Sequence, residues 1–252
     1  MTITMETGEF GGHACAWLSN GLVDLAVTMA RGPRVLFWGW AGQAADANLM
    51  AVVPEFSVRG FAFLGGHRLW AAPESFARTY QPDDAPPALH ELPDGARLTA
   101  PADGAGLIKE MILALALDAP RVRVTHVLRN AGSGPLELAP WAVSMLRLGG
   151  IMLLPQPLGR ADADGLLPNR RLILWPYSQM ADPRLRLGDR IIQVDARPGP
   201  PNKIGYLNQH GRLAYWIDGT LFSTRFDPRP AAAYPDAGCN AECYFDDMFL
   251  FL

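Results

Sequence analysis

Short apolar stretches separated by turn residues recur along the whole chain, and this spacing limits the fold more than any other feature. Glycine, proline, asparagine and aspartate punctuate the stretches, and these residue types favour tight turns. RVRVTHVLRN (121–130) alternates polar with apolar residues, which is the period of a strand with one buried face. The stretches that we expect to form strands lie at 22–29, 34–40, 97–102, 121–130, 136–146, 171–177, 190–196, 212–218 and 221–227.

Signals for helices are few. Residues 41–52 and 73–81 are each compatible with a short helix, and 107–117 fits a helix by propensity and a strand by alternation. The DGT at 218–220 predicts a tight hairpin. Many short strands, few helices and no repeat of fixed length predict an all-β, mainly antiparallel chain that forms a large sandwich or barrel. No linker or shift in composition divides the chain, so we expect a single domain over residues 1–252.

Composition and charge exclude several classes of protein. Hydrophobic residues make up 49% of the 252 positions and charged residues 19%, a balance that can fill a core. The formal net charge is −3 and no block of Lys and Arg occurs, which argues against a nucleic-acid partner. No apolar run reaches the roughly 18 residues that span a bilayer, and the polar start MTITMETGEF does not resemble a signal peptide. We therefore expect a cytoplasmic protein without a membrane partner.

The sequence offers no motif for a metal or a cofactor. The chain has an odd number of cysteines, namely Cys15, Cys239 and Cys243, and their spacing is not that of metal ligands. We therefore expect buried free thiols and no metal. A Ser-His-Asp elbow, a Walker loop, a dinucleotide fingerprint and an HExxH helix are all absent from the sequence. No cofactor is expected.

GGHRLWAAPE (65–74) concentrates polar and aromatic groups around two glycines, the composition of a site for a polar ligand. In an extended segment His67 points to one face, and Arg68 and Trp70 to the other. The alternative is structural: Trp70 in the core, His67 hydrogen-bonded in a turn, and Arg68 paired with Glu74.

Two further stretches of the first half supply candidates. THVLRN (125–130) contains His126, suited to general acid work if it faces a cleft, and Asn130 at a turn. Trp141 is suited to stack on the apolar face of a sugar ring. A core position is the alternative for both His126 and Trp141.

The second half contributes a lysine, a tyrosine and a carboxylate. Lys203 and Tyr206 lie in PPNKIGYLNQHG (200–211), where a solvated loop lysine is the alternative to a ligand contact. Glu242 lies in an apparent strand, which favours either a buried pair with Arg or Lys or a general-base role. Residues 167–185 add planar hydrogen-bonding groups and Trp175, as polyhydroxylated ligands require.

In this order, LSNGLVDLAVTMARGPRVLFW, GGHRLWAAPE, THVLRN, the APWAVSML stretch, the WPYS stretch and NKIGY resemble a family of galactose-mutarotase-like proteins. The likeness runs from about residue 17 to 247. It implies a β-supersandwich of the kind found in aldose 1-epimerases, with a concave face for saccharides.

The resemblance also implies a reaction. In aldose epimerases a histidine protonates the ring oxygen while a glutamate removes the anomeric hydroxyl proton. Applied to this sequence, His67 or His126 is the acid and Glu242 or Glu74 the base. The residues that would hold the saccharide are Arg68, Trp70, Asn130, Trp141, Lys203 and Tyr206.

The sequence departs from that family in two places. The epimerases' YFN motif is absent, and the chain stops at DDMFLFL (246–252) where relatives continue with a glutamate-rich segment. We therefore expect the last strand or strands to be missing, with an apolar edge available for a homo-oligomer. The alternatives to an aldose 1-epimerase-like isomerase are a non-catalytic carbohydrate-binding module and a structural or interaction domain.

Overall fold

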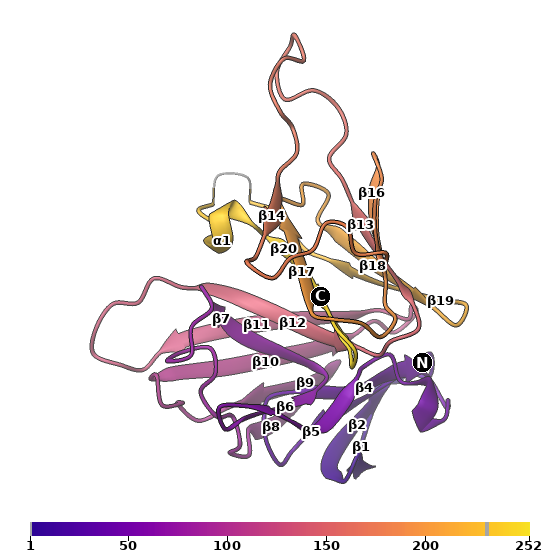
Figure 1. The fold of residues 1–252 in the computed structure, drawn as a ribbon. Helices are drawn as coiled ribbons and strands as arrows, with labels where there is room; N and C mark the ends of the chain where they lie inside the picture. Colours follow the sequence, from indigo (N-terminus) through magenta and orange to yellow (C-terminus); the bar gives the residue numbers. More distant parts are fainter. Residues whose placement is uncertain (1, 230–231) are drawn as a thin grey trace. The chain divides into compact units, whose positions relative to one another are not determined.

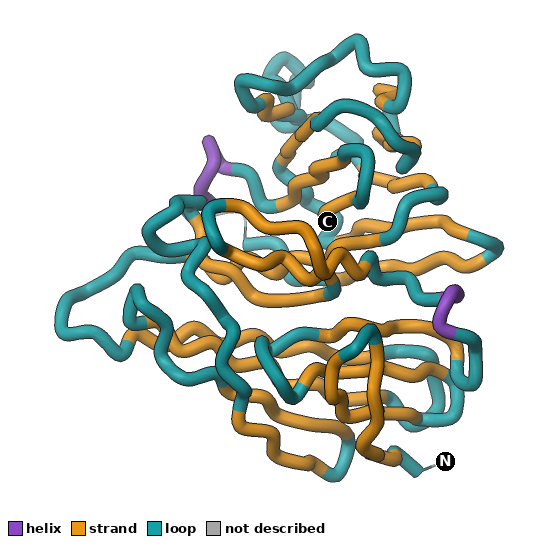
Figure 2. Tube along the Cα trace, turned by 60° about the horizontal axis from the view of Figure 1, so that its bottom comes forward, coloured by secondary structure: helices purple, strands orange, loops and turns teal. Residues whose placement is uncertain are grey.

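The regular secondary structure of the chain is almost entirely antiparallel β-strand. A computed structural model describes residues 2–229 and 232–252 (Figure 1), and strands account for most of the ordered elements (Figure 2). The expected all-β, mainly antiparallel, sandwich-like class is confirmed. The chain divides into two compact units, residues 1–146 and 147–252. The single sandwich domain over 1–252 stays a prediction.

The first unit contains two sheets and a hairpin. A sheet of order β1-β2-β3-β4-β7-β12 accompanies a sheet of order β11-β10-β9-β8, and β5 pairs with β6. The strands are β1 (Thr4–Phe10), β2 (His13–Ser19), β3 (Val23–Thr28), β4 (Val35–Trp40), β5 (Val52–Val58), β6 (Phe61–Gly65), β7 (His67–Ala72), β8 (Ala88–Leu92), β9 (Gly95–Thr99), β10 (Leu107–Leu115), β11 (Val122–Asn130) and β12 (Ala139–Leu146).

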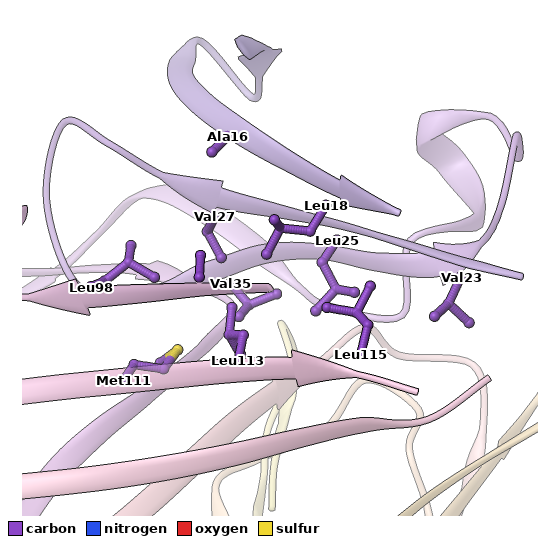
Figure 3. Packing of buried hydrophobic residues seen from close by; sticks show 11 residues of the cluster. Ala16, Leu18, Val23, Leu25, Val27, Val35, Leu98, Met111, Leu113 and Leu115 are labelled. Carbon is purple, nitrogen blue, oxygen red and sulfur yellow. The ribbon is translucent and has the colours of Figure 1, made fainter. Parts of the chain in front are cut away.

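The core of the first unit lies between its two sheets (Figure 3). Leu18 and Val27 of the one sheet belong to the same buried cluster as Leu98 and Leu113 of the other. In β10 the core residues include Leu107, Met111, Leu113 and Leu115, which follow the two-residue period of a strand. The alternation therefore decides the structure of 107–115, and the helical alternative is wrong.

Helices are few among the described residues, and none is long and apolar enough to cross a membrane. Residues 41–52 contain only the 3₁₀ turn η1 (Ala45–Ala47). Asn48 ends it, because its Oδ1 accepts hydrogen bonds from the backbone N–H of Trp38 and Met50. The short helix with which 73–81 is compatible does not form. There the Thr79 hydroxyl accepts from the Ser75 N–H and donates to the Ala71 carbonyl, a local pattern that competes with helix formation.

The second unit also contains two sheets, of order β21-β20-β17-β14 and β15-β16-β13-β18-β19. The hairpin predicted at 218–220 is confirmed: Asp218 and Gly219 join β18 to β19 with φ of 47° and 77°, the angles of a type I′ turn. The elements are β13 (Ile151–Pro155), β14 (Leu172–Leu174), β15 (Leu185–Leu187), β16 (Ile191–Asp195), β17 (Asn202–Tyr206), β18 (Arg212–Ile217), β19 (Thr220–Arg225), α1 (Pro235–Gly238), β20 (Ala241–Phe245) and β21 (Leu250–Phe251).

All three cysteines are buried and free, as expected. Burial raises the pKa of Cys15 to about 11 and that of Cys239 to about 12, and it raises the pKa of Cys243 further. These thiols are therefore protonated and apolar in character near pH 7.

Replacing Leu113 by alanine tests the core between the two sheets of the first unit. Leu113 is fully buried, so the truncation leaves a cavity and should lower the free energy of unfolding by about 2–5 kcal/mol. Urea unfolding measures the change. Leu221→Ala, at an exposed strand position, is the control and should change it by less than about 0.5 kcal/mol. Equal losses in the two variants would contradict the assigned core.

Candidate functional site

Two glycines let β6 turn directly into β7 in the first unit. Gly65 and Gly66 have φ of 97° and 75°, angles that favour glycine. A Cβ on Gly66 would collide with the carbonyl oxygen of Val35. The close approach places β7 between β4 and β12, so that every residue of β7 is buried. HRLWAA (67–72) therefore forms an interior strand, and the two glycines make the turn that precedes it.

The side chains of β7 divide between its two faces as an extended strand requires. His67 contacts Ser144 of β12 and His126 of β11. Arg68 lies instead against the rings of Phe61 and Trp70. The histidine and the arginine thus belong to different environments.

His67 and His126 form a buried pair. Their Nε2 atoms are 2.9 Å apart, and the His67 Nδ1 lies 2.8 Å from the Ser144 hydroxyl. Burial, with a smaller contribution from the neighbouring His126, lowers the pKa of His67 to about 3. Burial lowers the pKa of His126 to about 4. Both rings are therefore neutral near pH 7.

Arg68 is only 1% exposed and is enclosed by aromatic rings. Its Nη2 donates a hydrogen bond to the Phe63 carbonyl at 2.8 Å, and its guanidinium carbon is 4.8 Å from the Trp70 ring centroid. The Glu74 carboxylate accepts a hydrogen bond from the Tyr80 hydroxyl. Arg68 therefore packs against the aromatic rings through its buried guanidinium.

An aromatic cluster surrounds Arg68. Trp70 and Trp141 are paired across β7 and β12, with ring centroids 5.4 Å apart, and Tyr80 lies 5.4 Å from Trp70. Trp141 and Tyr80 are partly exposed, whereas Trp70 is buried. Trp141 is thus the ring of this pair that a ligand in solvent can reach.

Asn130 has a structural role at the end of β11. Its Oδ1 accepts from the Gly132 N–H at 2.9 Å and its amide donates to the Gly134 carbonyl at 2.6 Å. These bonds hold the turn after β11, and the structure does not bring Asn130 into contact with the histidine pair.

In the second unit, Lys203 and Glu242 form a buried ion pair. The Lys203 Nζ is 2.7 Å from the Glu242 Oε2, and both side chains are largely buried. Lys203 lies on β17, opposite Tyr244 of β20, while Glu242 lies opposite Gly205. Because paired residues and those two apart share a face, all four lie on one face of this sheet. The buried pair expected for Glu242 is present, and the alternative of a solvated loop lysine is wrong.

Burial raises the pKa of Glu242 to about 7. The positive charge of Lys203 lowers this pKa, while a hydrogen bond and the negative charge of Asp236 raise it. Both the protonated and the ionised form of the carboxyl are therefore accessible near neutral pH. A group in this condition can both accept and donate a proton at that pH.

Trp175 covers the lysine side of this ion pair. The Lys203 Nζ is 4.0 Å from the Trp175 ring centroid, a cation–π contact. Gly205 leaves room for the ring, since a Cβ there would lie 2.9 Å from an indole carbon of Trp175. Trp175 is partly exposed, so the group consists of an acid–base pair beside an accessible aromatic ring. We call Trp175, Lys203 and Glu242 the lysine–glutamate site.

Tyr206 does not join this site. It lies three residues from Lys203 on β17 and therefore on the other face of the sheet. It is buried, and its hydroxyl accepts a hydrogen bond from the Asn208 amide at 3.0 Å. Burial also raises the pKa of Tyr206 well above its usual value.

Within each unit, the structure brings several of the residues predicted from the sequence into contact with one another. His67 contacts His126, Arg68 and Trp70 share the aromatic cluster with Trp141, and Lys203 contacts Glu242. Sequence reasoning missed Ser144 and Asp236, which contact these groups from other elements. Among the described residues, no three His, Cys, Asp or Glu side chains gather as metal ligands would.

Comparison with solved structures gives a distant likeness. The solved structure of HI1317 is similar to this chain at 10% sequence identity and a TM-score of 0.37, over 100% of this chain and 98% of that one. No protein-family model matches the chain, and no curated protein matches it. A likeness this distant establishes neither a family nor an activity.

Acidification tests the histidine pair. Both histidines have a folded-state pKa below the usual 6.5, so the unfolded chain binds protons between about pH 6.5 and about pH 4 that the folded chain does not. The contribution of the two histidines to the free energy of unfolding should therefore fall as the pH falls through this range, by as much as about 1.4 kcal/mol per pH unit for each histidine. Glu242, whose pKa is raised to about 7, contributes a slope of the opposite sign below that pH, so the histidine contribution is measured as the difference between a histidine variant and the wild type.

Urea unfolding at a series of pH values measures this slope. His126→Asn should flatten it, because the variant lacks one of the two groups. His90→Asn, at an exposed position of β8, is the control and should keep the wild-type slope. An unchanged slope in His126→Asn would contradict the lowered pKa of the pair.

Proposed function

We propose that the chain binds an aldose at the lysine–glutamate site and interconverts its anomers. The proposal rests on one observation, the buried ion pair whose carboxyl has a pKa of about 7. Proton transfer needs an acid and a base whose pKa values suit the working pH. Glu242 meets that requirement at neutral pH, and Lys203 holds the exchangeable proton beside it.

Anomer exchange requires two proton transfers on adjacent oxygens. Glu242 takes the proton of the anomeric hydroxyl while Lys203 gives one to the ring oxygen. The bond between the anomeric carbon and the ring oxygen breaks, the aldehyde rotates, and closure on its other face gives the other anomer. Because both oxygens are bonded to the same carbon, a donor and an acceptor in contact with each other can serve them together.

Trp175 supplies the binding surface in this proposal. The axial C–H groups of a pyranose form an apolar face, and a flat indole is a suitable partner for it. Burial of Lys203 and Glu242 limits competing water, which strengthens their interaction with the sugar oxygens.

The histidine pair is assigned no step in this reaction. Both rings are neutral near pH 7, so a role as general acid stays a prediction. The family-level function, carbohydrate binding in the mutarotase-like superfamily, is likewise a proposal.

Carbohydrate binding without catalysis is the second candidate. The observation that favours it is the partly exposed Trp141 beside Trp70 and Tyr80, an aromatic surface on which a sugar ring can stack. Binding that Trp141→Ala abolishes, together with anomer exchange no faster than in buffer, would favour this candidate over the isomerase.

Glu242→Gln tests the base. The amide cannot accept the anomeric proton, so enzymatic anomer exchange should fall by about 10²-fold or more, while aldose binding persists. Saturation-transfer NMR on aldoses reports binding and exchange in one experiment. Glu137→Gln, at an exposed position, is the control and should exchange at the wild-type rate. Undiminished exchange in Glu242→Gln would exclude Glu242 as the base.

Trp175→Ala tests the binding surface. Loss of the stacked ring should weaken aldose binding by about 1 kcal/mol, roughly fivefold in Kd. Titration followed by NMR measures the affinity. Trp216→Ala removes an exposed tryptophan of β18 and should bind as the wild type does. If the two variants lose the same affinity, Trp175 is not the contact.

A further inference from the structure

We propose that Lys203 also forms a covalent imine with the aldehyde carbon of the open-chain aldose. The inference rests on the proposed function, because ring opening at the lysine–glutamate site creates that aldehyde next to the lysine. It adds a covalent intermediate, and hence a substrate class of free aldehydes, to a reaction that otherwise needs proton transfers alone.

The choice of residue is the first observation. Of the 22 Lys and Arg residues of the chain, only Lys109 and Lys203 are lysines. A guanidinium stays protonated in proteins and forms the stronger planar contacts, whereas an amine can lose its proton and attack a carbonyl. The ion pair with Glu242 and the contact with Trp175 would suit an arginine as well. A lysine in place of an arginine at this position therefore favours a role that needs a neutral, nucleophilic amine.

The geometry is the second observation. The Lys203 Nζ lies 2.7 Å from the Glu242 carboxylate and 4.0 Å from the Trp175 ring centroid. Lys203 occupies one face of the Trp175 ring, so in this proposal the sugar packs at the exposed edge of the partly exposed indole, with its anomeric carbon toward the amine. In the proposed ring opening Lys203 gives its proton to the ring oxygen, so the amine is neutral when the aldehyde appears.

The step balances with the groups at the site. The Lys203 nitrogen attacks C1, the C–N bond forms, and one amine proton passes to the former carbonyl oxygen to give a carbinolamine. Glu242, which holds the proton of the anomeric hydroxyl, gives it to the carbinolamine hydroxyl. Water leaves, and a protonated imine remains beside the ionised Glu242. Addition of water reverses the sequence and releases the aldehyde.

Lys109 is a built-in comparison for this chemistry. It is also buried, and its Nζ is 3.0 Å from the Asp103 carboxylate. In the first unit, Lys109 belongs to β10 and has an acidic partner, as Lys203 has. The proposal assigns imine formation to Lys203 alone.

Reductive trapping tests the inference on the full chain. The protein is incubated with glycolaldehyde, an aldehyde that needs no ring opening, or with glucose or galactose, and sodium cyanoborohydride is added to reduce any imine. Peptide mass spectrometry locates the adducts. Labelling at Lys203 should exceed that at Lys109 by about 10²-fold, within the range that a positioned acid–base group contributes.

Three variants make the result specific. Lys203→Arg keeps the charge and should lose the adduct, while Lys109→Arg should keep it. Glu242→Gln should slow trapping at Lys203, because the carbinolamine hydroxyl loses its proton donor. Circular dichroism and thermal unfolding establish that each variant is folded, so a lost adduct reports chemistry.

The outcomes separate this inference from the function on which it rests. Accelerated anomer exchange without an adduct at Lys203 overturns the imine and leaves the isomerase. An adduct at Lys203 without accelerated exchange supports the imine and overturns the isomerase. Equal labelling of Lys203, Lys109 and the N-terminal peptide is nonspecific glycation and overturns the inference.

Discussion

The contact between Lys203 and Glu242 is the interaction on which the proposed chemistry of the second unit depends. Two opposite charges taken out of water must compensate each other, because a single buried charge is costly. The same burial raises the pKa of Glu242 to about 7. The proposed reactivity thus depends on this arrangement, and the sheet that holds the pair also fixes the distance between Lys203 and Glu242.

Burial shifts the pKa values of Glu242 and of the histidine pair in opposite directions. It disfavours the charged form in both cases, which raises the pKa of the carboxyl and lowers the pKa of the histidines. Glu242 consequently changes its protonation near neutral pH, whereas His67 and His126 do so only in acid. This difference is why the proposed chemistry centres on the glutamate.

The sequence predicted the fold class because apolar periodicity is a local property. Alternation along 121–130 and the Asp-Gly turn at 218–219 each determine a strand or a hairpin without long-range information. The buried partner of Glu242 was predictable as a class, Lys or Arg, but its identity required the register of β17 against β20. Ser144 became visible only through its pairing with His67 across two strands. Residues 73–81 are compatible with a helix by propensity but do not form one, because the hydrogen bonds of the Thr79 hydroxyl outweigh that propensity.

The buried thiols have a practical consequence for studying this chain. Cys15, Cys239 and Cys243 are shielded from solvent, and their raised pKa leaves almost no thiolate at neutral pH. Thiolate is the form that alkylating reagents attack. A cysteine introduced on the surface of either unit would therefore react first, so fluorophores or spin labels could be attached at a chosen position without removing the native cysteines.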